Sequence, residues 1–183
     1  SRMSNFYTRK GDDGMTGLLG EGRLPKYHPR MEAIGSLDEA TATLGLARSL
    51  VQNAALKPIL LQTQRDLYGL MAEVAATPQN AAQFRSIDAT RVAWLENETD
   101  TLTETVEMPK EFILPGETQG SGALALARTV VRRAERRVAE LLDAGELENQ
   151  DLLRYLNRLS SLCFVLELAE NQFAEKETRK AKE

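Results

Sequence analysis

The sequence has very little of the chemistry that thiols and imidazoles provide. Its 183 residues include one cysteine, Cys163, and one histidine, His28. A lone cysteine forms no intrachain disulfide and no thiolate cluster for a metal ion, and it favours a reducing, cytoplasmic compartment. His28 precedes a proline in a loop and has no second ligand nearby, so we expect a structural role for it. These absences argue against a disulfide scaffold and against a protein-built metal site.

The sequence also lacks long apolar runs and an excess of positive charge. No run of about 18 apolar residues is present to span a bilayer, and no signal-peptide pattern is found. With 23 basic and 27 acidic residues the formal net charge is −4, whereas nucleic-acid-binding domains normally carry an excess of Lys and Arg. We therefore expect no membrane or nucleic-acid partner, and one domain over residues 1–183.

Several motifs of enzyme chemistry are missing as well. Glu-x-x-His pairs, which hold di-iron centres in helical bundles, do not occur. The sequence contains no Gly-x-Ser-x-Gly elbow and no cysteine–histidine pair for nucleophilic catalysis. If the chain is an enzyme, its reaction should need little acid–base help from the protein.

Glycine, in contrast, is concentrated near the N-terminus. Residues 1–29 carry five glycines and two prolines without a helical period, which predicts an ordered loop. Consecutive backbone N–H groups in a loop of small residues can approach phosphate oxygens. Thr8 and Thr16 add hydroxyls, and Lys10 and Lys26 add positive charge. The spacing is not a Walker motif, because no Gly-Lys-Thr opens a helix. A merely flexible tail is the alternative.

Apolar residues recur at alternating steps of three and four along most of the remaining chain, which is the period of amphipathic helices. Asp88 and Asn149 are good N-caps for the third and fifth of these helices. Five helices and no clear strand period predict an all-α fold, a five-helix antiparallel bundle. The helices are expected from Pro29 to about 51, from 56 to about 77, after Asp88, from 124 to about 141 and after Asn149.

The residues between and after these helices carry weaker signals. Gly145 is expected to cap the fourth helix at its C-terminus. Residues 107–122 contain two prolines and three glycines around Phe112, which predicts a long, partly buried connection. The charged tail, residues 174–183, is expected to fray.

The fourth predicted helix carries a dense arginine row. Arginines four residues apart repel one another unless anions lie nearby, and this row runs beside the apolar stripe. On the first helix Asp38 follows an apolar position, so we predict a partly desolvated ion pair between Asp38 and Arg128, with Glu39 at the surface. A solvated basic face with ordinary salt bridges is the alternative. The row comprises Arg128, Arg132, Arg133, Arg136 and Arg137, with Glu135 among them.

Four segments carry a pattern that is specific when they are taken together. They are YTRKGDDGMTGLLGEGRLPK near the N-terminus, RMEAIGSLDEATATLGLAR in the first helix, FILPGETQGSGALALARTVVRRAERRVAEL in the centre and YLNRLSSLCFVLELAEN in the last helix. In this order and across nearly the whole chain, they resemble the nucleotide loop, first helix, central segment and last helix of the PduO-type ATP:cob(I)alamin adenosyltransferases. The resemblance implies that the bundle is of ferritin-like type.

The resemblance implies a fold and a set of site residues. The fold is a cobalamin adenosyltransferase-like bundle that forms a homotrimer and holds ATP between adjacent subunits. Arg128, paired with Asp38, would shape the junction with the corrin, and Phe112 would press on the lower face of the cobalt. The implied ATP-binding residues are Thr8, Arg9, Lys10, Gly11, Thr16, Gly17, Lys26, Arg132, Arg133, Glu135, Arg136 and Asn157.

The implied reaction agrees with the missing acid–base motifs. Co(I) of cob(I)alamin is itself the nucleophile and attacks the C5′ carbon of ATP, and triphosphate leaves as a stable anion. Mg²⁺ would accompany the triphosphate without an all-protein cage. A reductase and an adenosylcobalamin-dependent acceptor enzyme are the further partners that this chemistry implies.

The sequence also departs from the family at four positions. Glu117 stands where a glycine is usual, Ala125 for a histidine, Ser161 for an aspartate and Leu168 for an arginine. These positions lie in the segments expected near the corrin. Two other hypotheses therefore stay open: a non-catalytic module that binds or delivers ATP or cobalamin, and a purely structural helical trimer.

Overall fold

The computed structural model describes residues 6–182, and the chain is mostly helical. The five predicted helices are present, and two pairs of very short strands and two single 3-10 turns accompany them. The elements are β1 (Met15–Gly17), β2 (Arg23–Pro25), α1 (Pro29–Leu50), η1 (Ala54–Leu56), α2 (Lys57–Ala75), η2 (Ala81–Phe84), α3 (Ala89–Thr103), β3 (Ile113–Leu114), α4 (Gln119–Asp143), α5 (Gln150–Phe173) and β4 (Arg179–Lys180).

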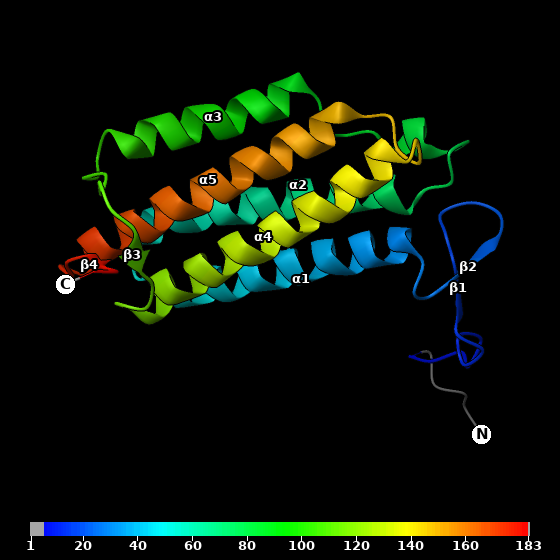
Figure 1. The fold of residues 1–183 in the computed structure, drawn as a ribbon, viewed down its shortest axis with the longest axis horizontal. Coiled ribbons are helices and arrows are strands. Elements are labelled where there is room, and N and C mark those ends of the chain that lie inside the picture. The colour runs from blue at the N-terminus through cyan, green and yellow to red at the C-terminus, as the bar shows by residue number, and fades with distance from the viewer. Residues whose placement is uncertain (1–5, 183) are drawn as a thin grey trace.

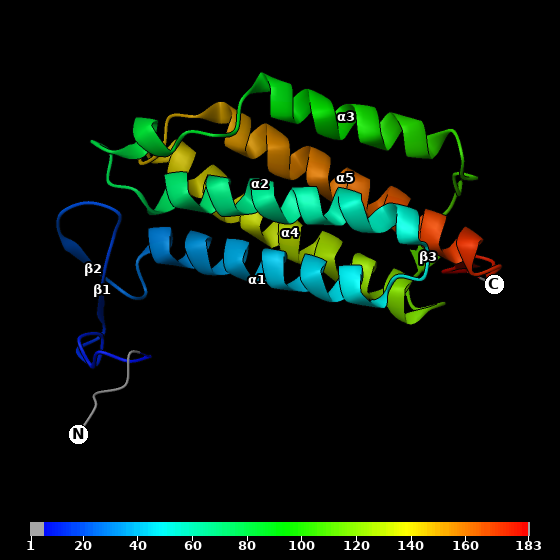
Figure 2. The same cartoon turned by 180° about the vertical axis from the view of Figure 1, so that it is seen from behind.

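The helices lie side by side in an elongated bundle (Figures 1 and 2). α1 packs against α2 and α4, and α4 packs against α5, each pair running antiparallel. α3 lies on the outside of α5 and runs in the same direction as α5, so the bundle is not antiparallel throughout. The two strand pairs occupy opposite ends of the bundle, β1–β2 beside the start of α1 and β3–β4 beside the end of α5.

Four of the five α-helices, all except α2, begin at residues whose side chains accept a backbone hydrogen bond. The side chain of Asp88 accepts from the Arg91 amide at 3.1 Å, and that of Asn149 accepts from the Asp151 amide at 3.1 Å. Both predicted N-caps are therefore confirmed. His28 caps α1, because its Nδ1 accepts from the Arg30 amide at 3.0 Å. The lone histidine thus has the structural role expected for it.

Gly145 ends α4 as predicted. Its φ of 74° is left-handed, a conformation that glycine adopts without steric cost. The Gly145 amide donates to the Leu142 carbonyl at 3.1 Å, and the Glu146 amide donates to the Leu141 carbonyl at 2.8 Å. This pair of hydrogen bonds is a Schellman motif, and it turns the chain directly into α5.

The core consists of the apolar stripes that the sequence predicts. On α4, for example, Leu124, Val131 and Val138 are fully buried. Cys163 on α5 is also fully buried as a free thiol, and burial raises its pKa to about 12. A thiol in this position packs as an apolar side chain and is not available as a nucleophile.

One buried charge holds three segments together at the hairpin end of the bundle. The side chain of Arg30 is only 2% exposed. It donates to the Val74 carbonyl at 2.8 Å, to the Glu146 carbonyl at 2.9 Å and to the Glu146 carboxylate at 2.8 Å. A buried arginine is stable only with such partners, so Arg30 fixes the start of α1 to the end of α2 and to the turn after α4.

The prediction that the C-terminal tail frays is wrong for the residues that form β4. Ile113 pairs with Lys180 and Leu114 pairs with Arg179 in an antiparallel ladder. The Ala181 amide adds a hydrogen bond to the Phe112 carbonyl at 2.8 Å. The tail is ordered here because the long connection before α4 offers unpaired backbone groups to a returning strand.

Candidate functional site

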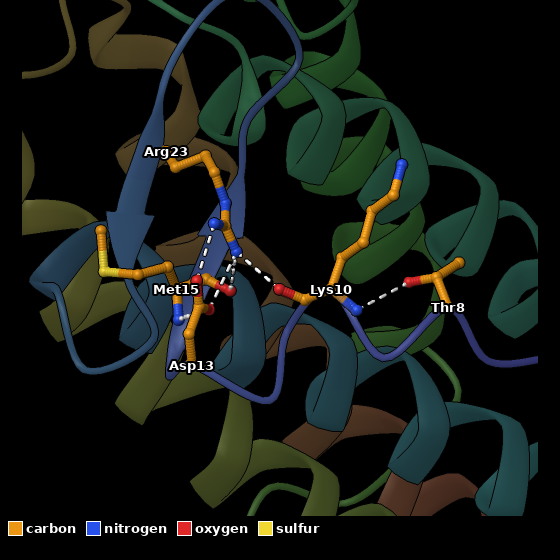
Figure 3. A network of polar contacts seen from close by, with 5 residues as sticks. All are labelled: Thr8, Lys10, Asp13, Met15 and Arg23. Carbon is orange, nitrogen blue, oxygen red and sulfur yellow. Dashed lines mark hydrogen bonds and ion pairs between the residues drawn. The ribbon is translucent and has the colours of Figure 1, made fainter.

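The glycine-rich N-terminal segment forms a β1–β2 hairpin organised by one arginine (Figure 3). Both terminal nitrogens of Arg23 donate hydrogen bonds to the Asp13 carboxylate, at 2.8 and 3.0 Å. It also donates to the carbonyls of Lys10 at 2.8 Å and Met15 at 3.1 Å. The hydrogen bonds from Arg23, and then that from the Met15 amide, hold the pKa of Asp13 below its ordinary value. These contacts give the loop a defined shape.

Four of the predicted loop residues lie close together around this network. A side chain at Gly11 would begin 2.9 Å from the Lys26 ammonium nitrogen, so the lysine packs directly on the glycine. The Lys26 amide donates to the Gly14 carbonyl at 2.9 Å. Thr8 accepts from the Lys10 amide at 3.3 Å. A cation packed on exposed backbone of small residues is suited to binding phosphate oxygens.

The remaining predicted loop residues flank this group. Thr16 and Gly17 belong to β1 and pair with Leu24 and Arg23 of β2. Arg9 has a left-handed φ of 63°, and its guanidinium lies 5.8 Å from the centre of the Tyr7 ring. A non-glycine residue rarely adopts this φ, so the turn at Arg9 is a strained point of the loop.

The hairpin is attached to the end of α2 through Leu19. The Leu19 amide donates to the Ala75 carbonyl at 2.8 Å, and its carbonyl accepts from the Thr77 amide at 3.1 Å. Gly20 follows with a φ of 144°, and a side chain there would lie 2.4 Å from Thr77 Oγ1. This close approach requires glycine.

The arginine row lies on α4, apart from the loop. Arg133 forms an ion pair with Glu39 of α1, and Arg137 forms one with Glu140 at 3.6 Å. The exposed Arg132 and Arg136 have neither a hydrogen bond nor an ion pair with any residue in the described range 6–182. Two neighbouring unpaired cations on one helix repel each other and favour an added anion.

Two further predicted site residues lie beside these arginines. Asn157 of α5 donates to the Glu135 carboxylate at 3.3 Å. The two predicted site residues are thus brought together across α4 and α5, and the pair gives the row an acceptor and an amide next to its positive charge.

The loop and the arginine row do not meet within one chain. For residues 7–27, no hydrogen bond or ion pair to the arginines of α4 is formed in the part of the chain that the structure describes. The hairpin projects from the end of the bundle and away from the helices (Figures 1 and 2). A ligand that needs both sets of groups would have to take them from two copies of the chain.

The predicted ion pair between Asp38 and Arg128 is not formed within this chain. Asp38 is exposed, whereas the preceding Leu37 is fully buried. Successive residues of a helix are rotated by about 100°, so Asp38 points away from the face of α1 that contacts α4. Nε of Arg128 is buried without a hydrogen-bond partner.

An acid on α5, Glu167, lies close enough to Arg128 for the two charges to interact. Glu167 is only 2% exposed, and burial raises the pKa of its carboxyl to about 7 despite the opposing charge of Arg128. Its carboxylate accepts no hydrogen bond from the described residues, so a half-neutral acid and an arginine share a poorly solvated site between α4 and α5.

Phe112 lies at the opposite end of the bundle from the hairpin. It directly precedes β3, and its side chain is 91% exposed. The adjacent Glu111 and Ile113 line a groove of about 690 Å³ that also contacts the tail and Leu168. Because side chains alternate along a strand, Phe112 faces away from this groove and toward open solvent.

Several organising residues were not singled out by the sequence. Asp13 and Arg23, which shape the loop, leave only a weak signal, a carboxylate and an arginine in a glycine-rich stretch. Glu167 occupies an apolar stretch of α5, where an acidic residue is unusual, so its position could have indicated a buried charge. No sequence pattern pointed to Arg179, because its ion-pair partner Glu117 is distant in the sequence.

The described residues contain no helix that is long and apolar enough to cross a bilayer. Within residues 6–182 no three His, Cys, Asp or Glu side chains are grouped to hold a metal ion.

Comparison with known proteins identifies the family. The family model of the cobalamin adenosyltransferases matches residues 6–170. The chain belongs to the cobalamin adenosyltransferase family. The corrinoid adenosyltransferase PduO of Citrobacter freundii is 39% identical over 170 residues, which cover 92% of this chain and 50% of that protein. The chain thus spans about half the length of this relative. The corrinoid adenosyltransferase of Bacillus subtilis is 36% identical over 164 residues, covering 87% of this chain and 83% of the relative.

Solved structures of the family share the fold. A variant of the PduO-type ATP:corrinoid adenosyltransferase from Lactobacillus reuteri, complexed with cobalamin and ATP, has a TM-score of 0.91 at 32% identity. The match covers 98% of this chain and 100% of that chain. A second variant, complexed with ATP, has a TM-score of 0.89 at 33% identity and covers 97% of this chain.

The four departures from the family pattern have different surroundings. Ala125 and Leu168 are buried, and Leu168 contributes an apolar wall to the groove beside β3. Ser161 is exposed on α5. Glu117 forms an ion pair with Arg179 of the tail at 3.3 Å. Two of the four positions therefore contact the segment around Phe112 or the tail that covers it.

Proposed function

We propose that this chain transfers the 5′-deoxyadenosyl group of ATP to the cobalt of cob(I)alamin, forming adenosylcobalamin and releasing triphosphate. The observation that carries the proposal is the match, over 98% of the chain, to a family structure complexed with cobalamin and ATP. The proposal extends to a homotrimer with ATP between adjacent subunits. The separation of loop and arginine row within one chain supports this assembly.

The loop and the arginine row supply complementary halves of an ATP site. The loop offers Lys10 and Lys26 beside exposed backbone, and α4 of a neighbouring subunit offers the unpaired Arg132 and Arg136. Charge-assisted hydrogen bonds from these cations would hold the triphosphate and stabilise the charge that grows on it as it leaves. The Glu135–Asn157 pair would add polar contacts to the nucleoside.

The reaction requires positioning more than proton transfer. The electron pair of Co(I) forms the cobalt–carbon bond at C5′, the C5′–oxygen bond breaks, and its electron pair leaves with triphosphate. No proton moves in this step, which fits a site without a histidine or a reactive thiol. Mg²⁺ would take its ligands from phosphate oxygens and water, because magnesium commonly keeps several waters and binds through substrate phosphates.

Phe112 and Arg128 are assigned to the corrin. The exposed Phe112 would cover the lower face of the cobalt and exclude an axial ligand, which makes Co(II) easier to reduce. Arg128, whose charge interacts with that of Glu167, would lie at the junction of the two substrates, where Asp38 of a neighbouring subunit would reach it. A reductase that supplies Co(I) and an acceptor enzyme that uses the product complete the scheme, which we place in the cytoplasm.

The test is a triphosphate-release assay with purified protein, ATP, Mg²⁺ and chemically reduced cobalamin. We expect triphosphate and adenosylcobalamin in equal amounts, and no triphosphate when cobalamin is omitted. Light scattering should give the mass of a trimer. Failure to form adenosylcobalamin under these conditions would exclude the proposed activity.

A second candidate is a non-catalytic module that binds or delivers ATP or cobalamin. It is favoured by two buried apolar residues, Ala125 and Leu168, at positions where the family resemblance leads us to expect histidine and arginine, and Leu168 lines the groove beside the Phe112 segment. This candidate predicts tight binding of cobalamin or ATP in calorimetry without turnover in the same assay.

A further inference from the structure

The segment that carries Phe112 has little structure of its own. Residues 104–118 connect α3 to α4 and contain only the two-residue strand β3. An exposed connection of this kind is normally mobile. In this chain its backbone is paired with residues from the end of the chain, residues 176–182, which we name the C-terminal strap.

The strap begins with a sharp reversal at the end of α5. The Glu175 amide donates to the Gln172 carbonyl at 3.1 Å, and the Lys176 amide donates to the Asn171 carbonyl at 2.9 Å. Asn171 then donates from its side chain to Thr178 Oγ1 at 3.2 Å. These contacts direct the chain back across the connection instead of outward into solvent.

Three contacts then join the strap to the Phe112 segment. β4 pairs with β3, and the Ala181 amide donates to the carbonyl of Phe112 itself at 2.8 Å. Arg179 Nε lies 3.3 Å from a carboxylate oxygen of Glu117. Glu117 directly precedes Thr118, the N-cap of α4. The strap therefore links the backbone of Phe112 to the rigid start of α4.

The strap also determines which way Phe112 faces. Lys176, Thr178 and Lys180 of the strap form one wall of the groove that Glu111 and Ile113 line. With its two neighbours held against the strap, Phe112 has to project to the other side. A free connection could rotate and lose this orientation.

We propose that Glu117 and Arg179 are positioning residues, which clamp the C-terminal strap onto the Phe112 segment and hold the phenyl ring in place for the corrin. This deepens the proposed function and rests on it through the assigned role of Phe112. Glu117 stands where the resemblance leads us to expect glycine, so the clamp is a feature of this chain's own residues.

The size of the effect follows from the exposure of the pair. The side chain of Arg179 is 58% exposed and that of Glu117 is 19% exposed. Exposed ion pairs contribute little to stability, so loss of the pair should loosen the strap without unfolding the bundle. A misplacement of about 1 Å at a reacting centre, in contrast, can cost up to about a hundredfold in rate. The clamp should therefore be visible in kinetics more than in stability.

The experiment compares Arg179→Gln, Glu117→Gln, the charge-exchanged pair Glu117→Arg with Arg179→Glu, and truncation after Glu175. The matched control is Arg154→Gln, which removes an equally exposed arginine from an ion pair with Asp151 near the start of α5. Each protein is assayed from Co(II) with a chemical reductant and from prereduced Co(I). Hydrogen exchange of the Phe112–Leu114 amides is followed without substrates.

We expect each single substitution to lower the rate from Co(II) roughly two- to fivefold, as for the loss of an exposed ion pair, and the rate from Co(I) less. Truncation should cost more, and the charge-exchanged pair should recover part of the loss. In the Phe112→Ala background Arg179→Gln should have no further effect. Amide exchange should become faster in the strap variants and stay unchanged in Arg154→Gln.

Equal losses from Co(II) and Co(I), or an undiminished loss in the Phe112→Ala background, would overturn the positioning role. Unchanged amide exchange at residues 112–114 after truncation would show that the strap does not hold the segment. Failure of the proposed function looks different, because then wild type itself forms no adenosylcobalamin while the exchange measurement can still report on the strap.

Discussion

Each end of the bundle carries a pair of short strands that is supported by an arginine–carboxylate contact, but the two contacts span very different distances in the sequence. At the hairpin end Arg23 and Asp13 are ten residues apart. At the strap end Arg179 and Glu117 are 62 residues apart. The first contact is bidentate and supported by two backbone carbonyls, whereas the second is a single contact.

Because the two contacts differ in sequence separation, the two ends of the bundle should become ordered in different ways. A short loop closes at a small entropic cost and can form by itself. The strap can pair with β3 only after α4 and α5 have packed, because these helices lie between its two partners in the sequence. The hairpin end should therefore keep its shape in every state of the bundle, and the strap end should be the first to loosen.

The largest effect is expected where the hairpin end depends on another subunit. Arg132→Ala should abolish or greatly weaken adenosyl transfer, by at least about 2 kcal/mol in kcat/KM, if this arginine makes a charge-assisted contact to the triphosphate. The control is Arg65→Ala, an exposed arginine on α2 outside the site. Wild-type kinetics of Arg132→Ala would remove α4 from the nucleotide site.

The strap end also contains Glu167, a buried acid whose carboxylate accepts no hydrogen bond from the described residues. Its pKa of about 7 in the fold exceeds the ordinary value of 4.5. Between these two pH values the unfolded chain releases the proton and the folded chain keeps it, so stability falls as pH rises, by roughly 3 kcal/mol in total. Glu167→Gln should therefore be more stable than wild type at pH 8 and about equally stable near pH 4.5.

Urea unfolding at the two pH values measures this difference. Glu96→Gln, at an exposed position of α3, is the control and should show no such dependence. If wild type and Glu167→Gln lose stability in parallel between pH 4.5 and 8, the buried carboxyl does not titrate in this range.

Gly20 tests the attachment of the hairpin to α2. Gly20→Ala would place a methyl group 2.4 Å from Thr77 Oγ1 at a φ of 144°, at a cost of about 2 kcal/mol if the local structure is kept. The expected outcome is a detached loop and a higher KM for ATP. Gly35→Ala, in an open position of α1, should instead stabilise the helix slightly. An unchanged KM for ATP in Gly20→Ala would separate loop attachment from nucleotide binding.

The sequence predicts well what depends on neighbours along the chain. The caps Asp88 and Asn149 and the end of α4 at Gly145 were predictable, because each acts on residues within one helical turn. The apolar stripes predicted the buried residues for the same reason. Thr8, Lys10, Gly11 and Lys26 were grouped correctly as one loop, although their proposed role in ATP binding remains a prediction.

What the sequence could not predict depends on contacts between distant segments. The Asp38–Arg128 pair is not formed within one chain, because a position next to an apolar stripe can point to either side of it. The strap was not predicted, because two-residue strands leave no alternating pattern in the sequence. Its residues looked like a charged tail, and only the backbone of the Phe112 connection makes them a strand.

The smallest predicted effect concerns how each end reverses the chain. The hairpin end uses glycines at positive φ, Gly14, Gly20 and Gly22, whereas the strap reverses at Glu175 with a φ of 57°. A left-handed conformation costs a non-glycine residue about 1–2 kcal/mol. Substitution by glycine removes this cost, but glycine also has more conformational freedom in the unfolded chain, which offsets part of the stabilisation. Glu175→Gly should therefore stabilise the protein by about 0.5–1 kcal/mol.

Urea unfolding compares Glu175→Gly with Ala174→Gly. Ala174 has an ordinary negative φ of −79°, so its replacement by glycine should not stabilise the protein. If Glu175→Gly is destabilised as much as Ala174→Gly, the reversal is not strained. In that case the weakness of the strap end would lie only in its single long-range ion pair and its short ladder, and not in the turn that leads into them.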